Sequence, residues 1–209
     1  MDDHKQELFY EMTEHLLKDE VPSIYLNELL KKPRSKEFPL NLLLKMQKTE
    51  QSKKHHPEGN VWNHTMLVTD EAAKVREKSK DSRVFMWAAL LHDIGKPDTT
   101  RMRKGRITAY DHDKVGTKLC VEFLRFFTDE EEFIDSVRVL VRYHMHMLYV
   151  LNKLPFGDIE NLLKEADINE IALLSLCDRL GRTGADIDEE QENYEKYLSK
   201  LQTEKEKVK

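Results

Sequence analysis

The sequence is poor in residues that cross-link a chain and in segments that enter a membrane. It contains only two cysteines, Cys120 and Cys177, and both fall within apolar helical patterns. A disulfide framework needs more cysteines, so we expect a reducing, cytoplasmic environment. Apolar runs are too short to span a bilayer, and the polar N-terminus lacks the layout of a signal peptide. The net charge of −5 excludes a strongly basic nucleic-acid-binding platform.

Glycine and proline are also scarce, with seven and six among 209 residues. Long stretches with a period of 3.6 residues lie between them, and no alternating strand pattern is found. We therefore predict an all-α fold, a helical bundle. Ser82 is expected to cap one of its helices. Helices are expected near residues 8–17, 24–30, 40–51, 61–79, 82–94, 112–127, 131–146, 158–165 and 168–181.

The length of the chain suits one domain with a small appendage. Residues 1–37 are expected to form an N-terminal helical extension, and residues 38–187 the principal domain. Residues 188–209 are highly charged. We expect them to form a solvated helix that frays into a disordered tail.

Ionisable residues fall on the inward, apolar faces of five predicted helices. Each follows apolar residues at spacings of three or four, so it shares their face. A buried carboxylate without a partner is costly, and buried charges are paired or bound to metal. Imidazole and carboxylate together suit a divalent transition metal such as Mn, Fe, Co, Ni or Zn. The residues are His64, His92, Asp93, His112, His144 and Asp178.

Other residues of the same types have a simpler interpretation. A single histidine on an apolar face is usually a core residue bonded to a carbonyl, and His146 is expected at the surface or rim because it lies two residues from His144. Two tryptophans and a phenylalanine cluster are expected in the core rather than on a base-stacking platform: Trp62, Trp87, Phe123, Phe126 and Phe127. A basic loop could meet a nucleotide or an RNA end: Arg101, Arg103, Lys104 and Arg106.

Four motifs carry a resemblance to a known family. They are residues 56–65 (HPEGNVWNHT), 91–97 (LHDIGKP), 110–116 (YDHDKVG) and 178–182 (DRLGR). Their order resembles the HD superfamily of metal-dependent phosphohydrolases, and within it the HD domain of bacterial tRNA nucleotidyltransferases, over residues 40–185. The resemblance implies that residues 38–187 form an HD-domain helical bundle.

Other branches of that superfamily fit less well. Guanosine alarmone hydrolases have a Glu-Asp pair after the His-Asp motif, where this chain has Gly95-Lys96-Pro97-Asp98. The cyclic di-GMP branch carries a Gly-Tyr-Pro signature that is missing after His144. The polymerase half of the nucleotidyltransferases needs a Gly-Ser loop and an Asp-x-Asp pair on a sheet. Asp186-Ile187-Asp188 lies downstream of the core in a non-strand context, and we interpret it as a polar linker. We therefore expect an HD domain that stands alone.

The resemblance also implies roles for individual residues. His64, His92, Asp93 and Asp178 hold a first metal. His112 and His144 complete a second site bridged by Asp93, or else stay free of metal and bind phosphate or transfer a proton, so one or two ions remain open. The expected catalytic residues are Asp93, Lys96 and His112, and the expected substrate-binding residues are Lys96, Arg182 and His144.

The expected activity is hydrolysis of a nucleotide or small phosphate ester by water activated on the metal. The resemblance favours 2′,3′-cyclic or 2′-phosphate nucleotides or RNA ends. An alternative is a non-catalytic, metal-containing module that senses a nucleotide or RNA. A third is a structural module whose charged C-terminal helix recruits a partner.

Overall fold

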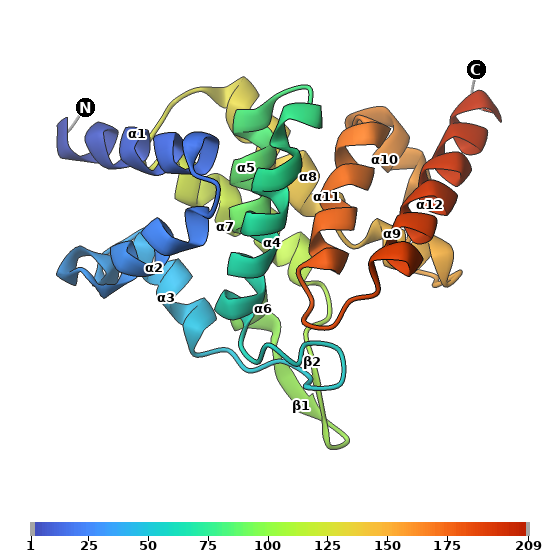
Figure 1. Ribbon diagram of the computed structural model, residues 1–209, viewed down its shortest axis with the longest axis horizontal. Helices are drawn as coiled ribbons and strands as arrows, with labels where there is room; N and C mark the ends of the chain where they lie inside the picture. Colours follow the sequence, from blue (N-terminus) through green and yellow to red (C-terminus); the bar gives the residue numbers. More distant parts are fainter. Residues whose placement is uncertain (1–2, 208–209) are drawn as a thin grey trace.

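The computed structural model describes residues 3–207 and confirms the all-α prediction (Figure 1). The α-helices are α1 (Asp3–Lys18), α2 (Pro22–Lys31), α3 (Leu40–Gln47), α4 (Val61–Val75), α5 (Ser82–Leu91), α6 (Lys96–Thr99), α7 (His112–Arg125), α8 (Glu131–Tyr143), α9 (His146–Leu151), α10 (Ile159–Glu165), α11 (Ile168–Leu180) and α12 (Ile187–Lys207). Short 3-10 helices span Pro33–Lys36 and Arg76–Lys78. None of the helices in this range is long and apolar enough to cross a membrane.

Helix α5 forms the centre of the molecule. Residues 84–91 are buried on every side of the helix, because α4, α8, α11 and α1 pack around it. A helix that is apolar all round is stable only in such an enclosed position. Its C-terminal end leads directly into His92 and Asp93, so the most enclosed helix places these two residues.

The N-terminal helices pack on the same core. Phe9 of α1 lies 5.1 Å from Trp87 between ring centroids. The Trp87 indole Nε1–H donates to Thr13 Oγ1 at 3.1 Å, and that of Trp62 donates to Asn27 Oδ1 on α2 at 2.9 Å. The division at residues 37 and 187 stays a prediction, while the contacts show that α1 and α2 cover the faces of α5 and α4.

Two differences from the predicted helix ends matter for the central helix and for the residues that follow α8. Asp81, not Ser82, caps α5, since its carboxylate accepts from the Val84 N–H at 3.0 Å while the Ser82 hydroxyl donates to the Arg76 carbonyl. The predicted helix 131–146 is interrupted, because α8 ends at Tyr143 and the chain turns before α9. This turn changes the direction in which the residues after Tyr143 point.

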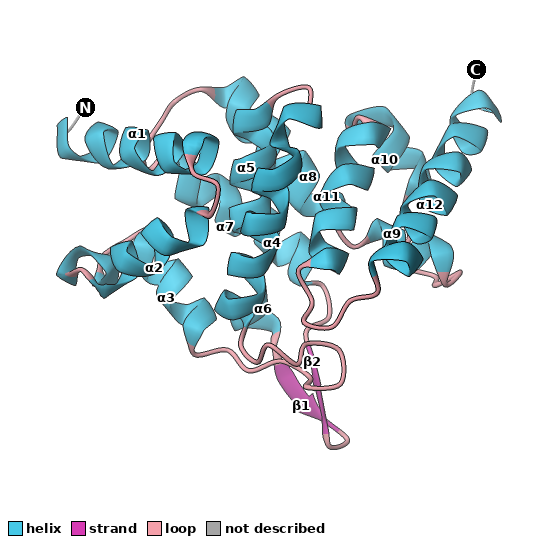
Figure 2. Cartoon of the chain, in the orientation of Figure 1, coloured by secondary structure: helices cyan, strands magenta, loops and turns pink. Residues whose placement is uncertain are grey.

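A β-hairpin occupies the predicted basic loop, so the expectation of no strand is wrong here (Figure 2). Strands β1 (Arg101–Arg103) and β2 (Arg106–Thr108) pair antiparallel, with Arg103 opposite Arg106. Lys104 and Gly105 both have positive φ, which the tight turn of a two-residue hairpin requires. Strands of three residues are too short to show an alternating pattern in the sequence.

The C-terminal helix is not the solvated segment that its charge predicted. Helix α12 packs along α11, and its Tyr197 and Leu201 are fully buried. A salt bridge joins the two helices, with Arg179 Nη2 of α11 2.6 Å from Glu190 Oε1 of α12. The apolar residues of α12 are few but recur on one face, and this was the signal that the overall charge obscured. The helix continues to Lys207, so no frayed tail is found up to that residue, and residues 208–209 of the predicted tail lie outside the described residues.

Candidate metal centre

The six inward ionisable residues meet at one end of the central helices. His64 comes from α4, His92 and Asp93 follow α5, and Asp178 comes from α11. His112 opens α7, and His144 follows α8. All six are buried, with at most 6% of any of them exposed. The structure therefore brings together every residue that the sequence assigned to the metal site.

Asp93 lies in the middle of this cluster. Its Oδ1 is 3.4 Å from His112 Nε2 and 3.6 Å from His144 Nε2. Its Oδ2 is 3.3 Å from His92 Nε2 and 3.9 Å from His64 Nε2. Two sets of three donors, each set within 4.8 Å, share this carboxylate: His64, His92 and Asp93 in one, Asp93, His112 and His144 in the other.

Asp178 and the histidine pairs close the cluster. Asp178 Oδ1 lies 2.9 Å from His64 Nε2, which adds a second carboxylate to the first set of donors. His112 Nε2 and His144 Nε2 are 3.2 Å apart. Two imidazole nitrogens this close both point at the same small volume, which is the arrangement of donors around a shared ion.

The backbone orients three of these histidines in the same way. The Nδ1 atoms of His92, His112 and His144 lie 2.7–2.8 Å from the carbonyls of Ala89, Ala109 and Val141, each three residues earlier. An Nδ1–H that donates to a carbonyl leaves the lone pair on Nε2. These three histidines therefore present Nε2 lone pairs toward Asp93.

The unpaired atoms of the cluster fit a metal ion. Among the described residues, His92 Nε2 and Asp93 Oδ1 are buried and make no hydrogen bond. Buried polar atoms are nearly always paired, so such orphans need an explanation. A divalent cation that accepts lone pairs from imidazole and carboxylate would satisfy both, and this donor set suits a transition metal.

Burial and charge act differently on the carboxylates and on the histidines of the cluster. Burial acts to raise the pKa of Asp93, but Lys96 and His92 outweigh it and hold this pKa well below its usual range. Asp178 is held low in the same way by Arg182 and His64. Burial lowers the pKa of His112 to about 3, against the opposing charge of Asp93. Burial acts to lower the pKa of His64 and His144, but the carboxylates beside them, Asp178 and Asp93, raise it. A metal ion bound here would displace such protons, because ionised carboxylates and neutral imidazoles are the states that ligate metals.

Two predicted cationic residues lie beside the cluster. Lys96 is buried, with its Nζ 2.6 Å from Asp93 Oδ2 and 2.8 Å from Gln51 Oε1. Lys96 therefore faces the cluster and not the solvent. Arg182 Nη2 lies 3.8 Å from Asp178 Oδ2 and forms a salt bridge with that aspartate.

A glycine allows the close approach of two segments here. A Cβ at Gly95 would lie 2.1 Å from the His112 carbonyl oxygen and 2.5 Å from the Gly116 backbone nitrogen. Only glycine fits such contacts with backbone atoms. Gly95 thus lets the first turn of α7 come against the turn after Asp93, which sets His112 beside that carboxylate.

Glu58 and His56 belong to this site although the sequence interpretation missed them. Glu58 Oε1 lies 2.9 Å from both His56 Nδ1 and His64 Nδ1, and Oε2 accepts from the Thr183 N–H at 3.3 Å. Burial acts to raise the pKa of Glu58, but contacts with His56 and His64 hold it well below its usual range. Both residues lie within the motif 56–65, but in a loop where no helical spacing marks an inward face.

His146 is not the rim residue that was predicted. It is fully buried, and its Nε2 accepts a hydrogen bond from the Asp158 N–H at 3.0 Å. The prediction assumed that one helix continues through residue 146. The break after Tyr143 lets His144 face the cluster and His146 face the loop before α10.

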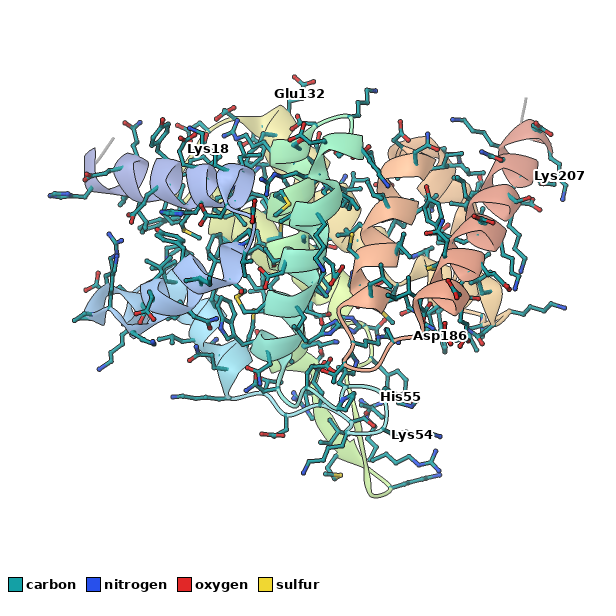
Figure 3. The ribbon with its side chains drawn as sticks, in the orientation of Figure 1. Lys18, Lys54, His55, Glu132, Asp186 and Lys207 are labelled. Carbon is teal, nitrogen blue, oxygen red and sulfur yellow. The ribbon has the colours of Figure 1, made fainter. Side chains whose placement is uncertain are left out.

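The cluster opens into a cavity of about 1240 Å³. Asp93, His112, Asp178, Lys96 and Arg182 all line it. Arg103, Ile107 and Thr108 of the β-hairpin line one side of the cavity. Lys54 and His55 lie beside the hairpin (Figure 3). The donors are therefore buried yet reachable by a small molecule, as in ligand and active sites.

Comparisons with known proteins point the same way. Proteins named Multifunctional CCA protein from three bacteria are similar to this chain. The protein from Actinobacillus pleuropneumoniae serotype 5b is 32% identical over 99 residues, which cover 46% of this chain and 23% of the relative. Those from Pasteurella multocida and Mannheimia succiniciproducens are 27% identical over 160 residues (71% of this chain, 37% of the relative) and 25% identical over 186 residues (85% and 43%). The chain spans less than half the length of these relatives. The model of the HD domain family matches residues 61–183, more than half of the chain, in a segment that holds all six residues of the cluster. The chain therefore belongs to the HD domain family, within the superfamily of metal-dependent phosphohydrolases.

Proposed function

We propose that this protein hydrolyses a nucleotide or another small phosphate ester. The observation that carries the proposal is the pair of donor sets sharing Asp93, with buried orphan atoms, at the floor of an open cavity. A site built for structure alone would be closed and would not line a cavity of this size. The resemblance favours 2′,3′-cyclic or 2′-phosphate nucleotides or RNA ends as substrates.

The residues that would hold metal are those of the two donor sets. His64, His92, Asp93 and Asp178 would hold a first ion. His112 and His144 would hold a second ion together with Asp93, or would stay free of metal and act on the phosphate. A divalent ion held there would polarise a phosphoryl oxygen and lower the pKa of a water molecule from 15.7 toward roughly 7.

The chain's own cations would bind and orient the phosphate. Lys96 Nζ already lies beside Asp93 in the cavity, and a phosphate oxygen offers it a second anionic partner. The Arg182 guanidinium suits bidentate contact with two phosphate oxygens. His112 and His144 present ring nitrogens to the same volume, where they could contact the phosphate or pass a proton to the leaving oxygen.

The test combines metal content with hydrolysis. Wild-type protein, loaded in turn with Mn, Fe, Co, Ni or Zn, is analysed by mass spectrometry and assayed on 2′,3′-cyclic nucleotides, 2′- and 5′-mononucleotides and glycerol phosphate. One or two bound ions with metal-dependent product release support the proposal. Bound metal and nucleotide without any turnover would support the sensor alternative instead.

A further inference from the structure

The cavity has a second wall that is aromatic and apolar. Helix α9 and the loop after it contribute Leu148, Tyr149, Leu154 and Phe156. Tyr110 comes from the separate segment between β2 and α7. Phe156 is 57% exposed and Tyr110 is 55% exposed. Large rings gathered in a concave surface and left open to water are typical of a ligand-binding groove.

This wall is held in place by packing behind it. The Tyr149 and Phe156 rings lie 5.6 Å apart at 65°. The buried His146 ring packs on Tyr149 at 5.5 Å, and its Nε2 accepts from the backbone of Asp158. His146 thus fixes both α9 and the loop that carries Phe156, so the two rings are presented toward the cavity in a defined arrangement.

The wall and the metal cluster share one cavity. Asp93, His112 and Lys96 line the same space as Tyr149 and Phe156. The chain also joins them, since His144 of the cluster stands just before α9. Cations lie on the remaining surface, where Arg103 stacks on Tyr110 at 4.9 Å from its ring centroid. A molecule that fills the cavity therefore meets the metal-binding residues and cationic side chains at one part and aromatic rings at another.

We infer that Tyr149, Phe156 and Tyr110 form a subsite for a planar aromatic group attached to the phosphate, namely the base of a nucleoside phosphate. This inference rests on the proposed function and names the substrate class for the same site. Aromatic side chains stack on any base, because every base has a π-face. The subsite therefore selects nucleotides over base-free phosphates without choosing among bases.

The experiment measures binding of hydrolysis-resistant ligands by titration calorimetry. Phosphonate analogues of adenosine 2′-, 3′- and 5′-monophosphate are each compared with the ribose phosphonate that lacks the base, using metal-loaded protein. At least one adenosine analogue is expected to bind about tenfold or more tightly than its base-free partner, the range of one stacked base. Phe156→Ala and Tyr149→Ala should remove this advantage and leave the affinity for the base-free ligand unchanged.

Two further variants keep the result interpretable. Phe156→Leu retains apolar bulk without a ring and should also lose the advantage, whereas Tyr10→Ala removes an exposed aromatic on α1, away from the cavity, and should keep it. The subsite is refuted if no analogue shows a base advantage, or if Phe156→Ala weakens both ligands equally. It is also refuted if wild type is a dimer that Phe156→Ala dissociates, because the wall would then be an interface between copies.

Failure of the subsite and failure of the proposed function have different signatures. Hydrolysis of base-free esters with no base advantage would refute the subsite and keep the proposed function. Base-selective binding without hydrolysis of any ester would refute the proposed function and keep the subsite.

Discussion

The middle of helix α5 and the residues at its C-terminal end are equally buried but hold opposite chemistry. In the middle, Trp87 packs against Phe9, which stacks on Phe127 at 5.6 Å between ring centroids, and the Trp87 Nε1–H donates to Thr13. At the C-terminal end, His92 and Asp93 are each only 1% exposed and still carry atoms without hydrogen-bond partners. The polar groups of the apolar middle are paired within the protein, while those of the C-terminal end lack partners.

This difference separates stability from function along one helix. Burial of aromatic surface stabilises the fold directly, at about 25 cal/mol per Å² of apolar area. Burial of charged groups costs free energy unless they are paired or bound to an ion. A chain keeps such a cluster where chemistry requires it. Substitutions in the apolar middle of α5 should therefore change the free energy of unfolding, and substitutions in the cluster at its C-terminal end should change metal binding and hydrolysis.

The largest effect is expected from Asp93→Asn. The substitution removes the charge that both donor sets share while keeping the size of the side chain. Bound metal should fall to background in mass spectrometry, and hydrolysis should fall with it, by about a hundredfold or more, since metal activation supplies several kcal/mol. The control is Asp98→Asn on α6, whose carboxylate is 47% exposed and lies 4.0 Å from Lys45.

Retention of metal by Asp93→Asn would contradict the site. The helical circular dichroism signal must match wild type for the comparison to count, because an unfolded variant would lose metal for a trivial reason. If the variant is folded and still binds a stoichiometric ion, the polar end of α5 is not the metal centre.

The apolar middle of α5 should respond in stability alone. Trp87→Ala removes a fully buried indole and the hydrogen bond to Thr13. Deletion of a buried aromatic side chain lowers the free energy of unfolding by about 3–5 kcal/mol. Urea unfolding measures this loss, and the exposed Tyr10→Ala provides the control. The folded variant should bind the same number of metal ions as wild type. A loss of metal would show that the apolar middle of α5 and the metal cluster are coupled.

Much of this contrast was predictable because helix periodicity is local. Spacings of three and four residues placed His64, His144 and Asp178 on inward faces, and the structure brings them together. The same pattern assigned Trp87 to the core, where it is fully buried. Side chains on regular helices can be placed from sequence, since their direction follows from the backbone.

Residues in loops and at helix breaks could not be placed in this way. Glu58 lies in a loop, and its contact with His64 depends on how the chain folds back before α4. His146 was misplaced because the turn after Tyr143 resets the helical direction. The same turn sets the direction of α9, and α9 and the loop after it place Tyr149 and Phe156 at the cavity. In each case the position depends on tertiary packing rather than on spacing along one helix.

A smaller effect at the polar end is expected from Glu58→Gln. The Glu58 carboxylate lies 2.9 Å from His64 Nδ1 and would hold the proton there, which leaves Nε2 free to bind an ion. An amide can present its NH₂ instead and no longer fixes the ring. Loss of such an outer partner costs about 10–100-fold in metal affinity.

Competition with a metal-binding dye measures this affinity. Glu50→Gln is the matched control, because Glu50 also lines the cavity but is exposed, so the change in charge is the same. An equal loss of affinity in both variants would mean that charge in the cavity, not orientation of His64, is responsible.

The smallest effect is expected at Arg83, at the protein surface beside the apolar part of α5. Arg83 makes two hydrogen bonds of 2.8 Å to Glu130 and lies 4.0 Å from the centroid of the Phe133 ring. Partly exposed pairs and cation–π contacts contribute at most about 1 kcal/mol each. Arg83→Gln should thus lower the free energy of unfolding by about 1 kcal/mol in low salt and by less in high salt, because salt screens the pair. Metal affinity should not change, because the contacts of Arg83 with Glu130 and Phe133 lie in the apolar part of α5, where the polar groups are paired within the protein. A change in metal affinity in this variant would show most clearly that the apolar part of α5 and the metal cluster are coupled.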